Sequence, residues 1–243
     1  MKDKKIIYFI IGIIIFIIIW QLIYIKINSE IIFPNIKSII LKLIEIISDN
    51  TFYKDLLSSI LRVLTTFILS FLLALILGIL SGIFLRLRYI LIPIINFIKT
   101  IPTIPLILVA IIWFDNNTVP IFVSFLIIFP IMYDSITNGI INIDKNLIEM
   151  SMLYNVSFKT QIINLYIPSI KEYILISISQ SMGITWKSIL SAEILSLPTF
   201  GIGTKLYESH LYLDSISLFS YCLIAIIFNG IFEIIIRFNN NGR

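Results

Sequence analysis

Long apolar runs alternate with short polar segments along the whole chain. A helix needs about 20 apolar residues to cross a membrane, and the runs therefore predict six spans, at residues 6–25, 63–85, 90–114, 119–133, 173–195 and 218–237. An even number of spans places both termini on one side of the membrane. The pattern predicts an all-α, polytopic membrane protein. We expect residues 1–243 to form a single transmembrane domain, because no internal repeat or low-complexity linker is visible.

The first apolar run has the basic start of a signal peptide, but it extends over about 20 residues and no small-residue cleavage site follows. We expect it to be retained as a transmembrane helix, with Trp20 and Tyr24 at the far interface. In residues 28–51 the apolar residues recur every three or four positions and the charged residues lie opposite them. The apolar residues are Ile36, Ile39, Ile40, Leu43, Ile46 and Ile47, and the charged ones are Lys37, Lys42 and Glu45. That spacing predicts an amphipathic helix lying on the membrane or on the bundle.

Prolines interrupt the third apolar run. Pro102 and Pro105 lie in the stretch KTIPTIPL, and Pro93 precedes them. Proline removes a backbone donor and clashes with the preceding turn, so the helix must bend or break there and neighbouring groups must satisfy the freed carbonyls.

Residues 135–172 form the main polar interruption in the second half of the chain. Asp144 is a good cap for a first short helix, and Asn155 is the best residue other than glycine for a left-handed position that ends it. Ser157 is a good cap for a second helix over residues 158–165, which Pro168 is expected to stop. The sequence therefore predicts a helical elbow outside the membrane.

Composition supports a membrane protein. The chain is 58% hydrophobic and 13% charged, against about 25% charged residues in ordinary soluble domains, and its mean hydropathy is +1.03. The net charge is +4, and the basic residues are scattered, so we expect contact with membrane lipid and none with nucleic acid. Cys222 is the single cysteine and can form no intrachain disulfide.

Charge also predicts the orientation. With the N-terminus inside, ten basic residues lie in inner segments, namely Lys2, Lys4, Lys5, Arg86, Arg88, Lys145, Lys159, Lys171, Arg237 and Arg243. Six lie in outer segments, namely Lys26, Lys37, Lys42, Lys54, Arg62 and Lys205. The excess favours cytoplasmic termini, and residues 135–172 then form a cytoplasmic loop.

Polar side chains recur at three-four spacing along the fifth span: Ser177, Gln180, Ser181, Lys187, Ser188 and Ser191. A central lysine in a membrane helix costs about 2.5–3.5 kcal/mol, so we expect this stripe to face the bundle interior or a dimer axis. Lys187 can attract an anion on a translocation pathway, pair with a carboxylate, or extend to the interface. For Glu193, near the outer end, a solvated interfacial carboxylate is favoured over a functional one.

The chain lacks the residues of the common catalytic and metal sites. His210 is its one histidine, so a histidine metal cluster is not expected. The stretch GIGTK lacks the spacing of a phosphate-binding loop and is interpreted as a tight turn. We predict no catalytic residue, metal or cofactor, and no enzymatic activity of this chain.

The polar segment resembles the cytoplasmic EAA loop of ABC importer permeases. Glu149-Met150-Ser151, three residues, Asn155, nine residues and Leu165-Tyr166-Ile167-Pro168 follow the family pattern Glu-Ala-Ala, three residues, Gly, nine residues, Ile-x-Leu-Pro. Both alanines and the glycine differ. Four further stretches follow in the order and spacing of permeases that import nitrate, sulfonates, taurine and thiamine precursors: KTIPTIPLILVAIIWFD, NVSFKTQIINLYIPSI, GITWKSILSAEIL and GIGTKL. Asp115 stands where that group usually has glycine.

The resemblance implies a permease subunit in the bacterial cytoplasmic membrane. Its expected partners are cytoplasmic ABC ATPase subunits, an extracytoplasmic substrate-binding protein and a second permease subunit, as a homodimer. Coupling to the ATPase would involve Glu149, Ser151, Asn155 and Pro168, and Gln180, Lys187 and Ser191 are candidates for the pathway. The alternative is a self-sufficient secondary transporter or small channel, which would need an internal repeat or a central run of paired ionisable residues.

Overall fold

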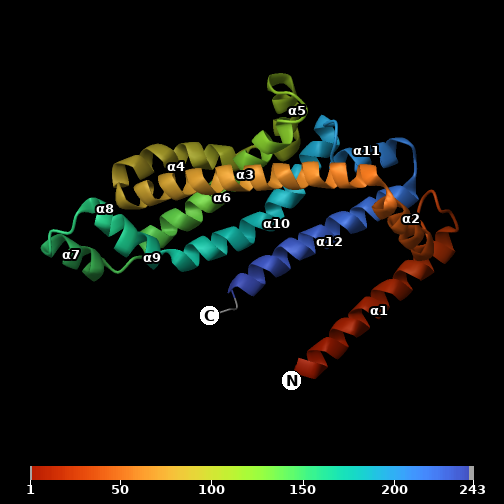
Figure 1. Ribbon diagram of the computed structural model, residues 1–243, viewed down its shortest axis with the longest axis horizontal. Coiled ribbons are helices and arrows are strands. Elements are labelled where there is room, and N and C mark those ends of the chain that lie inside the picture. The colour runs from red at the N-terminus through yellow and green to blue at the C-terminus, as the bar shows by residue number, and fades with distance from the viewer. Residues whose placement is uncertain (1, 241–243) are drawn as a thin grey trace.

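The computed structural model describes the backbone of residues 2–240 and the side chains of residues 7, 8 and 10–234. The side chains of Lys2, Lys4, Lys5 and Arg237, and the whole of Arg243, lie outside the described part. The regular elements of residues 2–240 are all helical (Figure 1): α1 Lys2–Ile27, α2 Ile36–Ser48, α3 Asn50–Ile83, α4 Leu85–Thr100, α5 Thr103–Trp113, α6 Val119–Ile141, α7 Lys145–Leu153, α8 Phe158–Gln161, η1 Ile162–Tyr166, α9 Ile167–Ser169, α10 Lys171–Ser196, α11 Ile202–Leu211 and α12 Ser215–Asn240.

The helices confirm the predicted fold class. Four of them are long and apolar enough to cross a membrane, and two bent pairs raise the number to as many as six. The second predicted span begins earlier than expected, because α3 starts at Asn50 and not at residue 63. Asp49 caps its first turn by accepting a hydrogen bond from the Thr51 N–H at 2.9 Å. Polar residues interrupt the apolar pattern in this first part of α3, so the sequence does not show it as part of a span. In the structure these polar residues are buried on one side of the helix.

The proline-rich span is broken, as predicted. α4 and α5 meet at an angle of 100° across Ile101 and Pro102. Pro93 lies inside α4 without ending it. α5 has 11 residues and is too short to cross a bilayer by itself.

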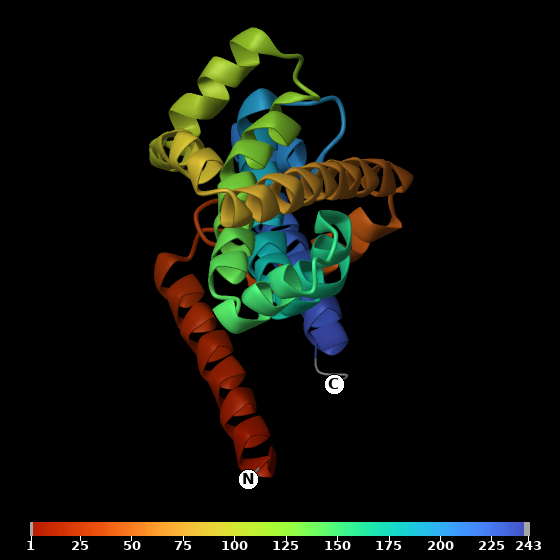
Figure 2. The ribbon, with the colours of Figure 1, turned by 90° about the vertical axis from the view of Figure 1, so that its left-hand side faces the viewer.

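α3, α6 and α10 form the centre of the bundle. Ile128, Met132 and Ile136 of α6 are fully buried in the main hydrophobic cluster. A second cluster surrounds Trp186 of α10, whose indole N–H donates to the Ala225 carbonyl of α12 at 2.8 Å. α1 runs apart from this bundle (Figure 2) and is held near its end, where the ring of Trp20 contacts Phe33 and Phe219.

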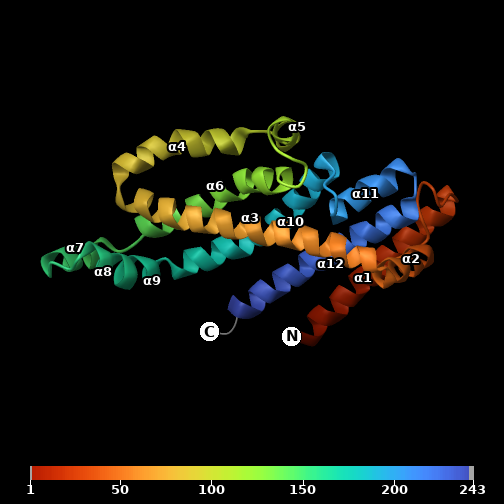
Figure 3. The same ribbon diagram turned by 45° about the horizontal axis from the view of Figure 1, so that its top comes forward.

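The two ends of the bundle carry different structures, as Figures 1 and 3 show. α7, α8 and α9 lie at one end, beyond the turn between α3 and α4, and α2 and α11 lie at the other. α2 is the predicted amphipathic helix, and it packs on the bundle through buried Ile39 and Ile46. The interpretation of GIGTK as a tight turn is wrong. Only Gly201 is in the turn, and the following residues begin α11.

We predict that Gly82→Ala destabilises the protein through the contact of α3 with α6. A Cβ atom at Gly82 would lie 2.4 Å from the Cβ of Ile140, and overpacking of this kind costs about 1–3 kcal/mol. Unfolding in detergent by heat or dodecyl sulfate measures the change. Gly230→Ala is the matched control, since nothing lies within 4 Å of the added atom. Equal stability of the two variants would contradict the close packing of α3 on α6.

Candidate functional site

The elbow between α6 and α10 begins with a well-capped helix. The Asp144 carboxylate accepts from the Asn146 N–H at 2.9 Å at the start of α7. At its end, Asn155 has a φ of 51°. The Asn155 N–H donates to the Met152 carbonyl at 3.0 Å and the Val156 N–H donates to the Ser151 carbonyl at 3.0 Å. These two bonds form a Schellman motif, so the left-handed role predicted for Asn155 is confirmed.

The second half of the elbow differs from the prediction at Pro168. Ser157 caps α8 as expected, accepting from the Thr160 N–H at 3.3 Å. The helix does not stop at residue 165, because a π-helical turn, η1, carries it into α9, where Pro168 occupies the first turn. The Ile167 N–H donates to the Ile162 carbonyl and closes the π-helical turn. Pro168 follows in the first turn of α9, where a proline leaves the helix intact. The chain bends by 59° into α10 only after Ser169.

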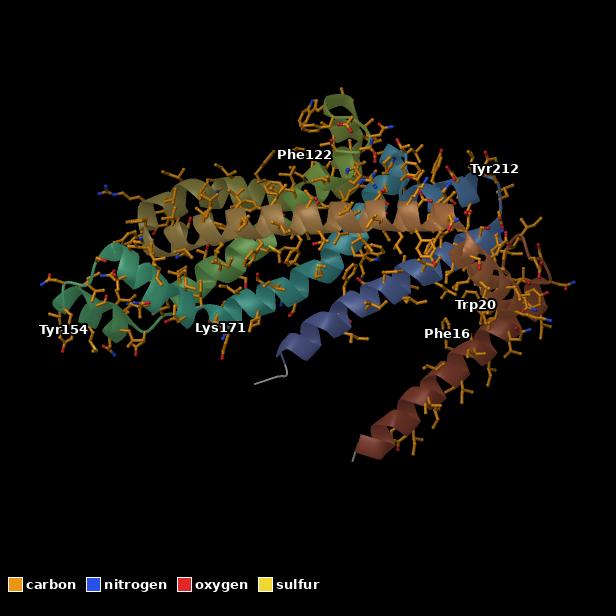
Figure 4. All side chains as sticks on the ribbon, viewed as in Figure 1. Phe16, Trp20, Phe122, Tyr154, Lys171 and Tyr212 are labelled. Atoms are coloured by element: carbon orange, nitrogen blue, oxygen red, sulfur yellow. The ribbon has the colours of Figure 1, made fainter. Side chains whose placement is uncertain are left out.

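The elbow presents an apolar surface to its surroundings. α7 and α8 bury no residue, and Leu153 and Tyr154 are 80% and 77% exposed at the tip (Figure 4). Glu149 is exposed beside them. A groove of about 360 Å³ runs between α7 and the second half of the elbow and is lined by residues that include Leu147, Met150, Ser151, Val156 and Leu165. An exposed apolar surface of this kind on a polar segment is typical of a docking site.

The elbow is joined to the bundle through its inner side. Tyr166 of η1, together with Ile143 before the elbow and Ile170 after it, is buried in the main hydrophobic cluster, and Ile148 and Ile162 pack against the same cluster. Packed side chains transmit displacement better than a mobile loop. This packing attaches the elbow to the neighbouring ends of α6 and α10.

The polar stripe of α10 divides between two faces. Ser177, Ser181 and Ser188 are buried in the bundle, and the hydroxyl of Ser188 contacts that of Ser124 at 2.8 Å. Gln180, Lys187 and Ser191 are exposed. At 100° per residue these positions fall within an arc of about 120°, so the stripe lies across the boundary between the buried and the exposed face of α10. Its place at the bundle interior or a dimer axis stays a prediction.

Lys187 forms no ion pair or side-chain hydrogen bond with any described residue. Together with Gln180, Ile184 and residues of α12, it lines a cavity of about 310 Å³. An unpaired lysine facing hydrocarbon would cost about 2.5–3.5 kcal/mol. This face is therefore suited to water or to another protein chain.

The expectation for Glu193 is wrong, because its side chain is fully buried. Glu193 Oε1 lies 2.6 Å from Arg62 Nη1 of α3. The Ser59 hydroxyl lies 2.8 and 2.9 Å from the two carboxylate oxygens, and the Gly203 N–H donates to Oε2 at 2.9 Å. The sequence places Arg62 in an outer segment just before the predicted span at 63–85, whereas in the structure it lies buried inside α3 with its charge neutralised by Glu193.

This ion pair also fixes the loop that precedes α11. Arg62 donates to the Phe200 carbonyl at 2.8 Å, and the Gly201 N–H donates to Asp55 at 3.0 Å. A Cβ atom at Gly203 would lie 2.4 Å from the Cβ of Glu193, so only glycine fits there. The sequence signal that would have revealed this cluster is a polar stripe on α3 at helical spacing: Asp55, Ser59, Arg62, Thr66 and Ser70, all buried.

Asp115 lies at the start of α6, at the end of the bundle that carries α11. Its carboxylate accepts from the Thr118 hydroxyl at 2.7 Å and from the Asn117 N–H at 3.0 Å. The hydrogen bond from the Thr118 hydroxyl, followed by those from backbone N–H groups, lowers the pKa of Asp115 despite opposing desolvation. Asp115 thus holds the turn from which α6 starts.

The described residues contain no group of three or more His, Cys, Asp or Glu side chains that could hold a metal ion. Several acidic groups of the described part cap helices or form ion pairs, as at Asp49, Asp144 and Glu193. The geometry therefore offers a docking surface at one end, a buried ion pair at the other and a polar cavity between them.

We predict that Glu193→Gln destabilises the protein by about 3–5 kcal/mol, because it leaves the Arg62 charge buried without compensation. Unfolding in detergent measures this loss. The double variant Arg62→Met with Glu193→Met should recover part of it, since both charges are removed. Glu45→Gln, which breaks the exposed pair with Lys42, is the control and should change stability by less than about 1 kcal/mol. A similar effect of both single substitutions would refute a structural role for the buried pair.

Comparison with known proteins identifies the family. The family model for the inner membrane component of binding-protein-dependent transport systems matches residues 70–242. A protein named as an ABC transporter permease in Brucella melitensis is 25% identical over 193 residues, which cover 79% of this chain and 78% of the relative.

Two further relatives carry more specific names. SsuC of Bacillus subtilis, named as an aliphatic sulfonates transport permease, is 26% identical over 90% of this chain and 80% of its own length. The nitrate import permease NrtB of Synechococcus elongatus is 29% identical over 49% of this chain and 42% of its own length. The chain belongs to the family of binding-protein-dependent transport system inner membrane components, and it is a permease of the ABC transporter type.

Proposed function

We propose that the chain is the membrane subunit of an ATP-driven importer and that a separate ABC ATPase binds the elbow formed by α7, α8 and α9. The observation that carries this proposal is the elbow itself: a capped segment with an exposed apolar tip and a buried attachment to α6 and α10. ATP-driven closure of the ATPases would displace the elbows and change the access of the pathway. Glu149, Ser151, Asn155 and Pro168 are the proposed coupling residues.

The proposed orientation places the elbow and both termini in the cytoplasm of a bacterial cell. The excess of basic residues in the segments assigned to that side supports it. Two copies of the chain, forming one domain each, would enclose the pathway, and an extracytoplasmic binding protein would deliver the solute to the end that carries α2 and α11. A self-sufficient transporter or channel would need no docking surface like the elbow.

The proposed solute is small and carries an anionic group. The names of two relatives refer to aliphatic sulfonates and to nitrate, and both are anions. Gln180, Lys187 and Ser191 are the proposed pathway residues, because they are polar, exposed and carried by one membrane helix. Lys187 would attract the anionic group.

We predict that Glu149→Lys lowers ATP-dependent uptake by at least about tenfold, equivalent to 1.4 kcal/mol, while the chain stays folded and inserted. The reversed charge would repel a basic partner group on the ATPase. Copurification of the ATPase and uptake into proteoliposomes measure the effect. Glu30→Lys reverses an exposed charge at the opposite end of the bundle, so it is the matched control for copurification and should leave the amount of bound ATPase unchanged. Undiminished uptake by the Glu149 variant would remove the elbow from the mechanism.

We predict that Asn155→Val uncouples the transporter and that Asn155→Gly does not. Position 155 has a φ of 51°, which strains a β-branched residue by about 1–3 kcal/mol and leaves glycine unstrained. The rate of amide hydrogen exchange in residues 145–156 should rise in the valine variant, and the rate of ATP-dependent uptake should fall. Equal uptake by both variants would show that a rigid end of α7 is not required.

A further inference from the structure

The turn between α3 and α4 lies beside the second half of the elbow. The ring centroid of Phe84, which follows α3, is 5.9 Å from that of Phe158, the first residue of α8. Figures 1 and 3 show the turn and α8 at the same end of the bundle. Arg86 and Arg88 come shortly after Phe84 in the chain, and Lys159 comes directly after Phe158. The contact between the two rings therefore brings three basic residues to one region.

This basic cluster, Arg86, Arg88 and Lys159, has no carboxylate beside it in the sequence. Residues 56–114 and 150–171 contain no Asp or Glu. The ion pairs of the described part join other residues, and the side chains of Arg86 and Lys159 are exposed. The cluster is therefore suited to an anionic group from outside the chain.

An exposed apolar strip begins at Arg86 and continues along α4. Ile90, Ile94 and Phe97 follow at steps of four, four and three residues, so they lie with Arg86 within an arc of about 80° on the helix. These three apolar side chains are 63%, 50% and 68% exposed. α4 runs beside the membrane-spanning α3 (Figure 1). Phe97 is about 16 Å from Arg86 along the helix, which is about half the thickness of the hydrocarbon core.

A basic cluster at the head of an apolar strip of this length matches a molecule with an anionic head and a hydrocarbon tail. A free phosphate ion would contact the basic cluster and leave the strip uncovered. An acidic side chain of a cytoplasmic protein would not reach Phe97, which lies within the bilayer. An anionic phospholipid fits both parts, because its headgroup and its acyl chain occupy the same two levels of the membrane.

We propose that the basic cluster and the apolar strip of α4 form a site for an anionic phospholipid. The phosphate group binds the basic cluster, and one acyl chain lies along the strip. Because the cluster includes residues of the α3–α4 turn and of α8, the bound lipid joins this turn to the elbow. The site goes beyond the proposed function, since it requires neither an ATPase nor a solute.

Native mass spectrometry of the full-length chain in a non-ionic detergent tests the proposal by measuring bound lipid. The probes are dioleoylphosphatidylglycerol, dioleoylphosphatidylcholine, which has the same chains and no net charge, and glycerophosphoglycerol, which has the anionic headgroup without chains. We expect dioleoylphosphatidylglycerol to bind at least about tenfold more tightly than either of the others. Equal binding of the two lipids, or equally tight binding of glycerophosphoglycerol, would overturn the proposal. Because the assay contains no ATP and no ATPase, failure of the importer mechanism would leave its result unaffected, and the converse also holds.

Double variants assign the site to the basic cluster. Arg86→Gln with Lys159→Gln should weaken dioleoylphosphatidylglycerol binding by about tenfold or more, whereas Arg86→Lys with Lys159→Arg keeps both charges and should retain it. Lys37→Gln with Lys54→Gln is the matched control, because it removes two exposed charges at the opposite end of the bundle (Figure 1). Unchanged lipid binding in the first double variant would overturn the proposal. If that variant also lost a copurifying ATPase, the cluster would instead belong to the ATPase contact.

Discussion

Hydrocarbon offers no hydrogen bonds, so a charged side chain buried in the bundle needs its partners within the protein. The pair of Arg62 and Glu193 is the clearest consequence of that constraint. Two charges on different spans neutralise each other at 2.6 Å, and a hydroxyl and a backbone N–H complete the carboxylate's partners. The same groups hold the loop before α11, so this buried cluster joins α3, α10 and the start of α11.

α10 connects this ion pair to the elbow. Its first turn follows the elbow directly, the polar cavity lies at its middle, and Glu193 lies near its last turn. A displacement of the elbow would therefore act on the cavity through a single continuous helix, while the ion pair holds the opposite end against α3. This arrangement suits alternating access, in which rigid helices move between two packed states.

The features predicted from the sequence are those with local causes. The caps at Asp144 and Ser157, the left-handed Asn155 and the break near Pro102 each depend on a few neighbouring residues. The burial of Glu193 and Arg62 does not follow from the sequence, because their pairing joins positions 131 residues apart. At Pro168 the sequence predicted the disruption of the helix but not its form, since a π-helical turn accommodates the proline where a stop was expected.

The exposed side chains of α1 and those of the α10–α12 face differ in polarity. The exposed side chains of α1 are almost entirely apolar, and lipid can cover them without loss. The exposed Gln180, Lys187 and Glu233 beside the cavity are not compatible with lipid, because the bilayer would leave their polar groups unsatisfied. The bilayer therefore favours an arrangement in which α1 faces lipid and the α10–α12 face is turned to water or to a second copy of the chain. A water-filled space between two subunits would meet this requirement, because water would satisfy the polar groups of Gln180, Lys187 and Glu233.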